Sequence, residues 1–145
     1  AIQTIFRKQK LKDVKGQKIL IVDDDPFNTT VAEKFLKKNG FECDICYNGK
    51  EAVDKVAKEK YHAILMDCEM PEMDGYTAAR LIRQKNPELL IVGVTGHSEE
   101  ACLNKARRNG MSVVETKPLN MKKIISLLFK QQQQASVISP PASIC

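Results

Sequence analysis

Three short runs of apolar residues constrain the fold of this chain more than any other feature. They cover residues 19–22, 63–66 and 90–94, and none of them alternates between apolar and polar side chains. Such continuous runs are typical of strands in a parallel sheet that is buried on both faces. Residues 41–46 and 112–115 are shorter strand candidates, so we expect five strands in all.

Helical patterns lie between these strands. In the first pattern Asp25 is a candidate N-cap, Pro26 stands in the first turn and Gly40 ends the helix. Residues 48–51 (Asn-Gly-Lys-Glu) resemble a capping box for the second helix. Apolar residues recur at helical spacing in the first and last helices: Phe27, Val31, Phe35 and Leu36, and then Met121, Ile124, Ile125 and Leu128. Alternating strands and helices predict a three-layer, doubly wound α/β fold with right-handed crossovers.

Composition divides the chain into one domain with two tails. Residues 131–145 are rich in Gln, Ser and Pro and are predicted to be a disordered tail. Residues 1–17 are polar and basic and are predicted to be a linker, which leaves residues 18–130 for the domain. The net charge of +5 resides within residues 1–18. Because the rest of the chain is neutral overall, its charge does not favour nucleic-acid binding.

The five cysteines and the apolar runs indicate a soluble domain in the cytoplasm. No apolar run approaches the roughly 20 residues that a membrane-spanning helix needs, so we expect no membrane contact by this domain. An odd number of irregularly spaced cysteines favours reduced thiols. Cys43 and Cys46 form a C-x-x-C pair within an expected strand, and we interpret them as small core residues rather than a redox or zinc site.

Polar residues follow four of the expected strands at their carboxyl ends. They are Asp23-Asp24-Asp25, Asp67, Thr95 and Lys117-Pro118. In an open parallel sheet, ligands bind in the crevice beyond those ends. The fold would therefore bring these residues together, although they are far apart in the sequence.

The expected cluster suits phosphoryl chemistry. Asp23, Asp24 and Asp67 would repel one another unless a cation lay between them, and Mg²⁺ or Mn²⁺ suits oxygen ligands beside phosphate. The cation would keep Asp67 ionised, so that its carboxylate could act as a nucleophile and form an acyl phosphate. Lys117 would supply a fixed positive charge and Thr95 a hydroxyl donor.

Four segments carry a resemblance to the response-regulator receiver family of two-component and phosphorelay systems. They are residues 19–24 (ILIVDD), 65–75 (LMDCEMPEMDG), 94–96 (VTG) and 117–118 (KP). The sequence is most similar to receivers of hybrid histidine kinases, and the resemblance extends over residues 18–130. It implies the flavodoxin-like strand order 2-1-3-4-5.

The resemblance also implies a role for each site residue. Asp67 would accept a phosphoryl group from a phosphohistidine on a histidine kinase domain or a histidine-containing phosphotransfer protein. Asp24, Asp67 and the backbone carbonyl of Glu69 would bind the metal directly, and Asp23 would act mainly through a water molecule. Thr95 and Lys117 would contact the phosphoryl group. Such a domain is not a conventional enzyme, because it catalyses only its own phosphorylation and dephosphorylation and then signals by phosphotransfer or a conformational switch.

Several positions depart from the family's common pattern or modulate it. Val114 stands where many receivers have an aromatic switch residue, Gly96 replaces a frequent Ala, and Asp25 replaces a frequent Asn. Glu69 and His97 each lie two residues beyond a site residue. We hypothesise that these two side chains set the lifetime of the phosphoaspartate.

Two other functions compete with this interpretation. Asp23-x-Asp25 after the first strand resembles the nucleophile and acid of haloacid-dehalogenase phosphatases, although Phe27 does not fit that motif and Asp67 would have no role. A degenerate receiver that only binds a partner is the other alternative, and the complete set of acidic, Thr and Lys residues argues against it. The sequence shows no output domain after residue 130, which fits a relay or a part of a larger kinase.

Overall fold

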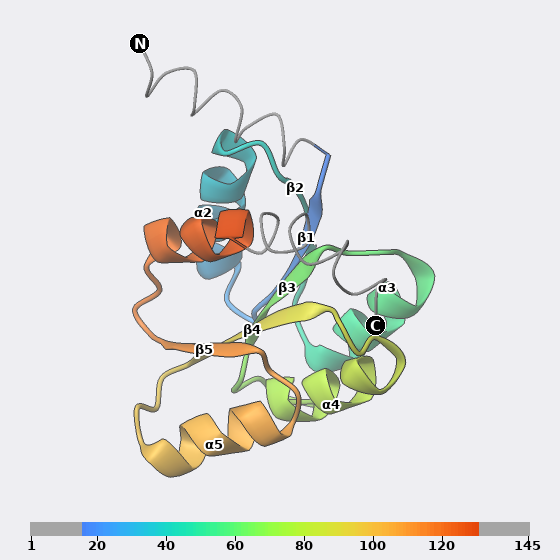
Figure 1. Ribbon diagram of the computed structural model, residues 1–145, viewed down its shortest axis with the longest axis vertical. Helices are drawn as coiled ribbons and strands as arrows, with labels where there is room; N and C mark the ends of the chain where they lie inside the picture. The colour runs from blue at the N-terminus through green and yellow to red at the C-terminus, as the bar shows by residue number, and fades with distance from the viewer. Residues whose placement is uncertain (1–15, 131–145) are drawn as a thin grey trace, which may run out of the picture.

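The computed structural model describes residues 16–130 of the chain (Figure 1). Its elements along the chain are β1 (Lys18–Val22), α2 (Pro26–Lys38), β2 (Glu42–Cys46), α3 (Gly49–Lys58), β3 (Ala63–Asp67), α4 (Gly75–Lys85), β4 (Leu90–Thr95), α5 (Glu100–Arg108) and β5 (Val113–Thr116). Residues 121–130 are helical as well. The predicted alternation of strands and helices is therefore confirmed. Most of the predicted linker and all of the predicted tail, residues 1–15 and 131–145, lie outside the described residues, and the predicted domain boundaries stay a prediction.

The five strands form one parallel sheet in the order β2-β1-β3-β4-β5. This is the order that the family resemblance implied, so that prediction is confirmed. Asp67 at the end of β3 pairs in register with Val94 of β4, and Thr95 at the end of β4 pairs with Thr116 of β5. The carboxyl ends of the strands consequently meet along one edge of the sheet.

Helices cover both faces of the sheet, as Figure 1 shows. Leu20 and Val22 of β1 belong to a core cluster that includes residues of α3, α4 and α5. Ile19 and Ile21 belong to a second cluster, which includes residues of α2 and of the helix at 121–130. Successive strand residues point to opposite faces, so the continuous apolar runs of the sequence supply both cores at once.

The C-x-x-C pair is part of these two cores. Cys46 is buried in the first cluster, while Cys43 packs at the edge of the second, on the other face of the sheet. Both thiols are free, and burial raises the pKa of each above its ordinary value, to about 12 for Cys43 and about 11 for Cys46. The placement agrees with the interpretation of both as small core residues.

The helix ends follow the sequence signals closely. The side chain of Asp25 accepts a hydrogen bond from the backbone of Phe27, which makes it the predicted N-cap of α2. After the C-cap Asn39, Gly40 has a φ of +93°, a conformation that glycine adopts without a steric cost. Asn48 caps α3, but Glu51 reaches back to the backbone N–H of Tyr47 rather than to that of the N-cap.

Two strands begin one residue later than the sequence indicated. Phe41 precedes β2, because its backbone N–H donates to Leu36 at the end of α2. Ser112 precedes β5, and its hydroxyl bonds the backbone N–H of Ile91. None of the helices in the described part of the chain is long and apolar enough to span a membrane.

Candidate functional site

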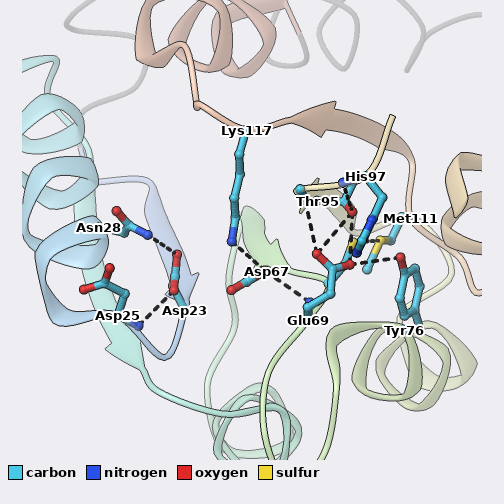
Figure 2. Close-up of polar contacts among 12 residues, drawn as sticks. Asp23, Asp25, Asn28, Asp67, Glu69, Tyr76, Thr95, His97, Met111 and Lys117 are labelled. Carbon is cyan, nitrogen blue, oxygen red and sulfur yellow. Dashed lines mark hydrogen bonds and ion pairs between the residues drawn. The ribbon is translucent and has the colours of Figure 1, made fainter. Parts of the chain in front are cut away.

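Polar side chains from four strand ends converge at the carboxyl edge of the sheet (Figure 2). Asp23 follows β1, Asp67 ends β3, Thr95 ends β4 and Lys117 follows β5. Fixed strand pairings bring these residues together, because each lies at the carboxyl end of a strand in the same parallel sheet. The convergence was predicted from the positions of these residues after the apolar runs.

Three acidic residues at this edge form a group that could hold a cation. One carboxylate oxygen from each of Asp23, Asp24 and Asp67 lies within 4.8 Å of the others. Asp24 is exposed and Asp23 half-buried. The Asp23 carboxylate is oriented by the backbone N–H of Asp25 at 2.9 Å and by the side-chain amide of Asn28 at 3.2 Å.

Asp67 is the buried member of this group, with only 2% of its surface exposed. Its Oδ1 atom lies 3.2 Å from Nζ of Lys117 and accepts a hydrogen bond from the backbone N–H of Glu69 at 3.2 Å. Its Oδ2 atom is also buried, and no side chain or backbone group among the described residues donates to it. An unpaired buried carboxylate oxygen is costly, so this atom is where a cation or another electrophile would find a ligand.

Burial, and then the nearby Asp23 carboxylate, raise the pKa of Asp67 from 3.8 to about 6. Lys117 and the backbone N–H of Glu69 act in the opposite direction but do not cancel the rise. A divalent cation would favour the ionised form of all three carboxylates. The buried oxygen, the raised pKa and the all-oxygen donor set therefore fit a hard cation.

Lys117 joins the last two strands at the site. Its backbone N–H donates to the carbonyl of Thr95 at 2.8 Å, and its peptide bond with Pro118 is cis. Burial lowers the pKa of Lys117, but the Asp67 carboxylate outweighs that effect and the net pKa is raised. The ammonium group therefore stays positively charged beside Asp67.

The loop after β3 packs tightly against Asp67. A Cβ atom on Gly75 would collide with the carbonyl oxygen of Asp67, and the Gly75 N–H donates to the carbonyl of Cys68 at 3.0 Å. Asp74 caps α4 by accepting from the backbone of Thr77. Asp74 and Gly75 thus start α4 against the backbone of Asp67. These two residues of the 65–75 segment therefore have a role in packing.

A second set of contacts surrounds Thr95, which is fully buried. Its hydroxyl donates to the Glu69 carboxylate, with Oγ1 at 3.0 Å from Oε2 and 3.2 Å from Oε1. The same carboxylate accepts from the backbone N–H of Gly96 at 3.1 Å and from the hydroxyl of Tyr76 at 3.1 Å. Figure 2 shows the Glu69 side chain between Thr95 and Tyr76.

His97 and Val114 lie at the margins of the site. The backbone N–H of His97 donates to the Thr95 hydroxyl, but its imidazole is mostly exposed and lies 3.8 Å from Glu99. Val114 is half-buried in β5 and packs against the same core cluster that contains Tyr76. Neither side chain reaches Asp67 through any contact recorded for the described residues.

A cleft of about 310 Å³ opens beside the acidic group. Asp23, Asp67 and Lys117 form its polar end. Phe27 and Val31 of α2 lie on its apolar side, and Phe27 is 73% exposed. The cleft gives an incoming molecule access to the buried Asp67.

Sequence reasoning missed two residues that the structure adds to the site. Asn28 is the third residue of α2. In the sequence, only its spacing of five residues from Asp23 could have suggested their contact. Tyr76 directly follows Gly75, and no feature of the sequence indicated that its hydroxyl meets Glu69.

Comparisons with known proteins agree with this geometry. A family model described as the response regulator receiver domain matches residues 19–129. Two-component response regulator 24 of Arabidopsis thaliana is 38% identical over 77% of this chain and 81% of its own length. Hybrid signal transduction histidine kinase B of Dictyostelium discoideum is 35% identical over 81% of this chain, which spans 7% of that kinase.

A solved structure gives the same result in three dimensions. The receiver domain of a sensor histidine kinase from Pseudomonas aeruginosa superposes with a TM-score of 0.75 and 32% sequence identity, covering 81% of this chain and 98% of that one. That structure has a magnesium ion coordinated in its active-site cleft.

Proposed function

This chain belongs to the response regulator receiver domain family, and from that premise we propose that Asp67 accepts a phosphoryl group from a phosphohistidine in a reaction that requires Mg²⁺. One observation carries the proposal. Asp67 is a buried carboxylate with one oxygen held by Lys117 and the other without a hydrogen-bond donor among the described residues. Such a group is poised for an electrophile rather than for a structural ion pair.

The proposed reaction is a displacement at phosphorus. An oxygen of the Asp67 carboxylate attacks the phosphorus atom, and the bond between phosphorus and the donor histidine nitrogen breaks. The bonding electrons go to that nitrogen, and Asp67 becomes an acyl phosphate. Lys117 offsets the negative charge of the phosphoryl oxygens, and the Thr95 hydroxyl can donate a hydrogen bond to one of them.

Asp23, Asp24, Asp67 and the backbone carbonyl of Glu69 would hold Mg²⁺ or Mn²⁺ at this site. When bound, the cation would neutralise charge on the acidic group and on the phosphoryl oxygens. Asn28 and the backbone of Asp25 hold the Asp23 carboxylate in place. The Asp23 carboxylate is therefore oriented before any cation arrives, which reduces the ordering that binding requires.

We expect the donor to be a histidine kinase domain or a histidine-containing phosphotransfer protein in the cytoplasm. The signal would leave by phosphotransfer or by a conformational switch, and no contact with nucleic acid or membrane is needed. The hydrolase alternative gains no support from the geometry, because the Asp25 carboxylate that would act as its acid caps α2 instead.

Incubation with acetyl phosphate or phosphoramidate, followed by intact-mass spectrometry, tests the proposal. We expect a gain of one phosphoryl group that requires Mg²⁺ and disappears in Asp67→Asn. Asp54→Asn is the matched control, because Asp54 is an exposed acid on α3. Wild-type protein that takes no phosphate would favour a module that only binds, and phosphate on Asp67→Asn would overturn the acceptor assignment.

Glu69 and His97 belong to the same proposal as residues that set the lifetime of the phosphoaspartate. Both contact Thr95, Glu69 through its carboxylate and His97 through its backbone N–H. Replacing both by Ala is expected to change the rate of dephosphorylation, measured as loss of the phosphoryl mass after the donor is removed. Identical decay in the double variant and the wild type would remove this role. Val114→Phe tests in the same assay whether an aromatic side chain at this position in β5 changes the rate of dephosphorylation.

A further inference from the structure

The Glu69 carboxylate is held by three donors from two segments of the chain. They are the hydroxyl of Tyr76 on α4, the hydroxyl of Thr95 at the end of β4 and the backbone N–H of Gly96 beyond it. All three distances lie between 3.0 and 3.1 Å. The carboxylate therefore fixes the hydroxyl group of Thr95 on the side away from Asp67 (Figure 2).

This arrangement conflicts with the proposed chemistry. The Thr95 hydroxyl carries a single hydrogen and can donate one hydrogen bond. While it donates to Glu69, it cannot donate to a phosphoryl oxygen on Asp67. A phosphoryl group at Asp67 would also repel the carboxylate of Glu69. Glu69 is close to Asp67 in the chain, and its backbone N–H donates to the Asp67 carboxylate. The hydrogen bond between Thr95 and Glu69 must therefore break before the Thr95 hydroxyl can donate to a phosphoryl group on Asp67.

Tyr76 is well placed to control that release. Its ring is buried, with 7% of its surface exposed, and packs in the core cluster of α3, α4 and α5. Nζ of Lys105 on α5 lies 4.4 Å from the centre of the ring, a distance at which a cation is attracted to the ring face. Burial raises the pKa of Tyr76, so its hydroxyl keeps its proton and remains a donor. The packed ring therefore holds the hydroxyl in place, and Glu69 is the partner that would have to move.

We infer that Tyr76 is a positioning residue that holds the Glu69 carboxylate on Thr95 and thereby slows phosphorylation of Asp67. The inference rests on the proposed function of Asp67 as the acceptor. It also assigns a role to an aromatic residue on α4 in a chain that has Val114 in β5 where many receivers have an aromatic residue.

The test is Tyr76→Phe, which removes one hydroxyl and keeps the ring and its packing. With this hydrogen bond gone, Glu69 leaves Thr95 more easily, and the initial rate of phosphorylation by acetyl phosphate is expected to rise about three- to tenfold. The rate is followed by intact mass, because the chain has no Trp to report on the site by fluorescence.

Tyr61→Phe is the matched control. The Tyr61 hydroxyl also lies within hydrogen-bond distance of carboxylates, 2.6 Å from Asp44 and 2.9 Å from Glu59, and its ring is buried to a similar extent. Tyr61 precedes β3 and so lies at the opposite end of that strand from Asp67. Its variant tests the general effect of losing a buried tyrosine hydroxyl, and its rate of phosphorylation should equal that of the wild type.

A double variant separates positioning from a merely structural effect. In a Glu69→Ala background the Tyr76 hydroxyl has no carboxylate to hold, so Tyr76→Phe should change the rate no further. An unchanged rate in the single variant would overturn the inference. A rise that persists in the Glu69→Ala background, or that also occurs in Tyr61→Phe, would overturn it as well.

The amide of Gly96 gives a readout that does not depend on phosphorylation. Its N–H donates to the Glu69 carboxylate, which Tyr76 holds. Tyr76→Phe should therefore speed hydrogen exchange at this amide in protein that has not been incubated with a phosphodonor. If the wild type takes no phosphate, the proposed function fails. Whether Tyr76 positions the Glu69 carboxylate is then decided separately, because an unchanged rate of hydrogen exchange at Gly96 in Tyr76→Phe refutes it. Unchanged phosphorylation with a normal wild type refutes only the role of Tyr76.

Discussion

Replacing Asp67 by Asn should stabilise the fold at neutral and higher pH when no divalent cation is present. The pKa of Asp67 is about 6 in the folded protein, against an ordinary value of 3.8. An acid with a raised folded pKa contributes stability below its unfolded pKa and loses that stability as the pH rises through the folded one. Asn carries no charge at any of these pH values, so the variant avoids the loss.

The size of the effect follows from that difference in pKa. About two pKa units correspond to about 3 kcal/mol of lost unfolding free energy once Asp67 is ionised. The ion pair with Lys117 is already part of that pKa, because it lowers the value that burial and Asp23 raise, so its loss carries no separate cost. We therefore expect a gain of about 3 kcal/mol at pH 8.

Urea unfolding followed by far-ultraviolet circular dichroism measures this gain, with EDTA present. For a domain of this size the midpoint should rise by about 1.5 M at pH 8, and the difference should shrink at pH 4.5. Asp54→Asn, which replaces an exposed acid, is the control and should show neither effect. A variant less stable than the wild type at pH 8, or a difference independent of pH, would refute the reasoning from buried charge.

Three further predictions follow from the same site. Mg²⁺ at ten times its dissociation constant should raise the unfolding free energy by about 1.4 kcal/mol in urea titrations, and Asp24→Asn should reduce that gain. Lys117→Met should raise the pKa of Asp67 further and slow phosphorylation by acetyl phosphate at least about tenfold, measured by intact mass. Gly75→Ala should lower the unfolding free energy by about 3 kcal/mol or more, because the added Cβ would meet the Asp67 carbonyl. Gly96→Ala, which would place its Cβ in open space, should change the unfolding free energy by less than about 0.5 kcal/mol in the same urea titrations. Equal effects of the two glycine substitutions would contradict the close approach at Gly75.

Much of the fold was predictable because its signals are local. The apolar runs at β1, β3 and β4 lack alternation since each strand supplies side chains to both cores. Asp25 and Gly40 mark the ends of α2 by residue type alone. The strand boundaries at Phe41 and Ser112 depended instead on hydrogen bonds with neighbouring elements, which a sequence pattern does not encode.

The site divides in the same way. Asp67 and Lys117 were predictable because each stands at the carboxyl end of an expected strand, and strand ends in a parallel sheet converge. The contact between Tyr76 and Glu69 was not predictable, because it depends on where α4 begins relative to the end of β3. Gly75 sets that position by packing against the backbone of Asp67, and only the folded structure shows the resulting distance.

Borohydride trapping shows whether Asp67 itself carries the phosphoryl group. Borohydride reduces an acyl phosphate to an alcohol and so converts a phosphorylated aspartate to homoserine at the same position. The protein would be phosphorylated with acetyl phosphate and Mg²⁺, reduced, digested and sequenced by mass spectrometry. We predict homoserine at position 67, and homoserine at position 23 with none at 67 would contradict the account.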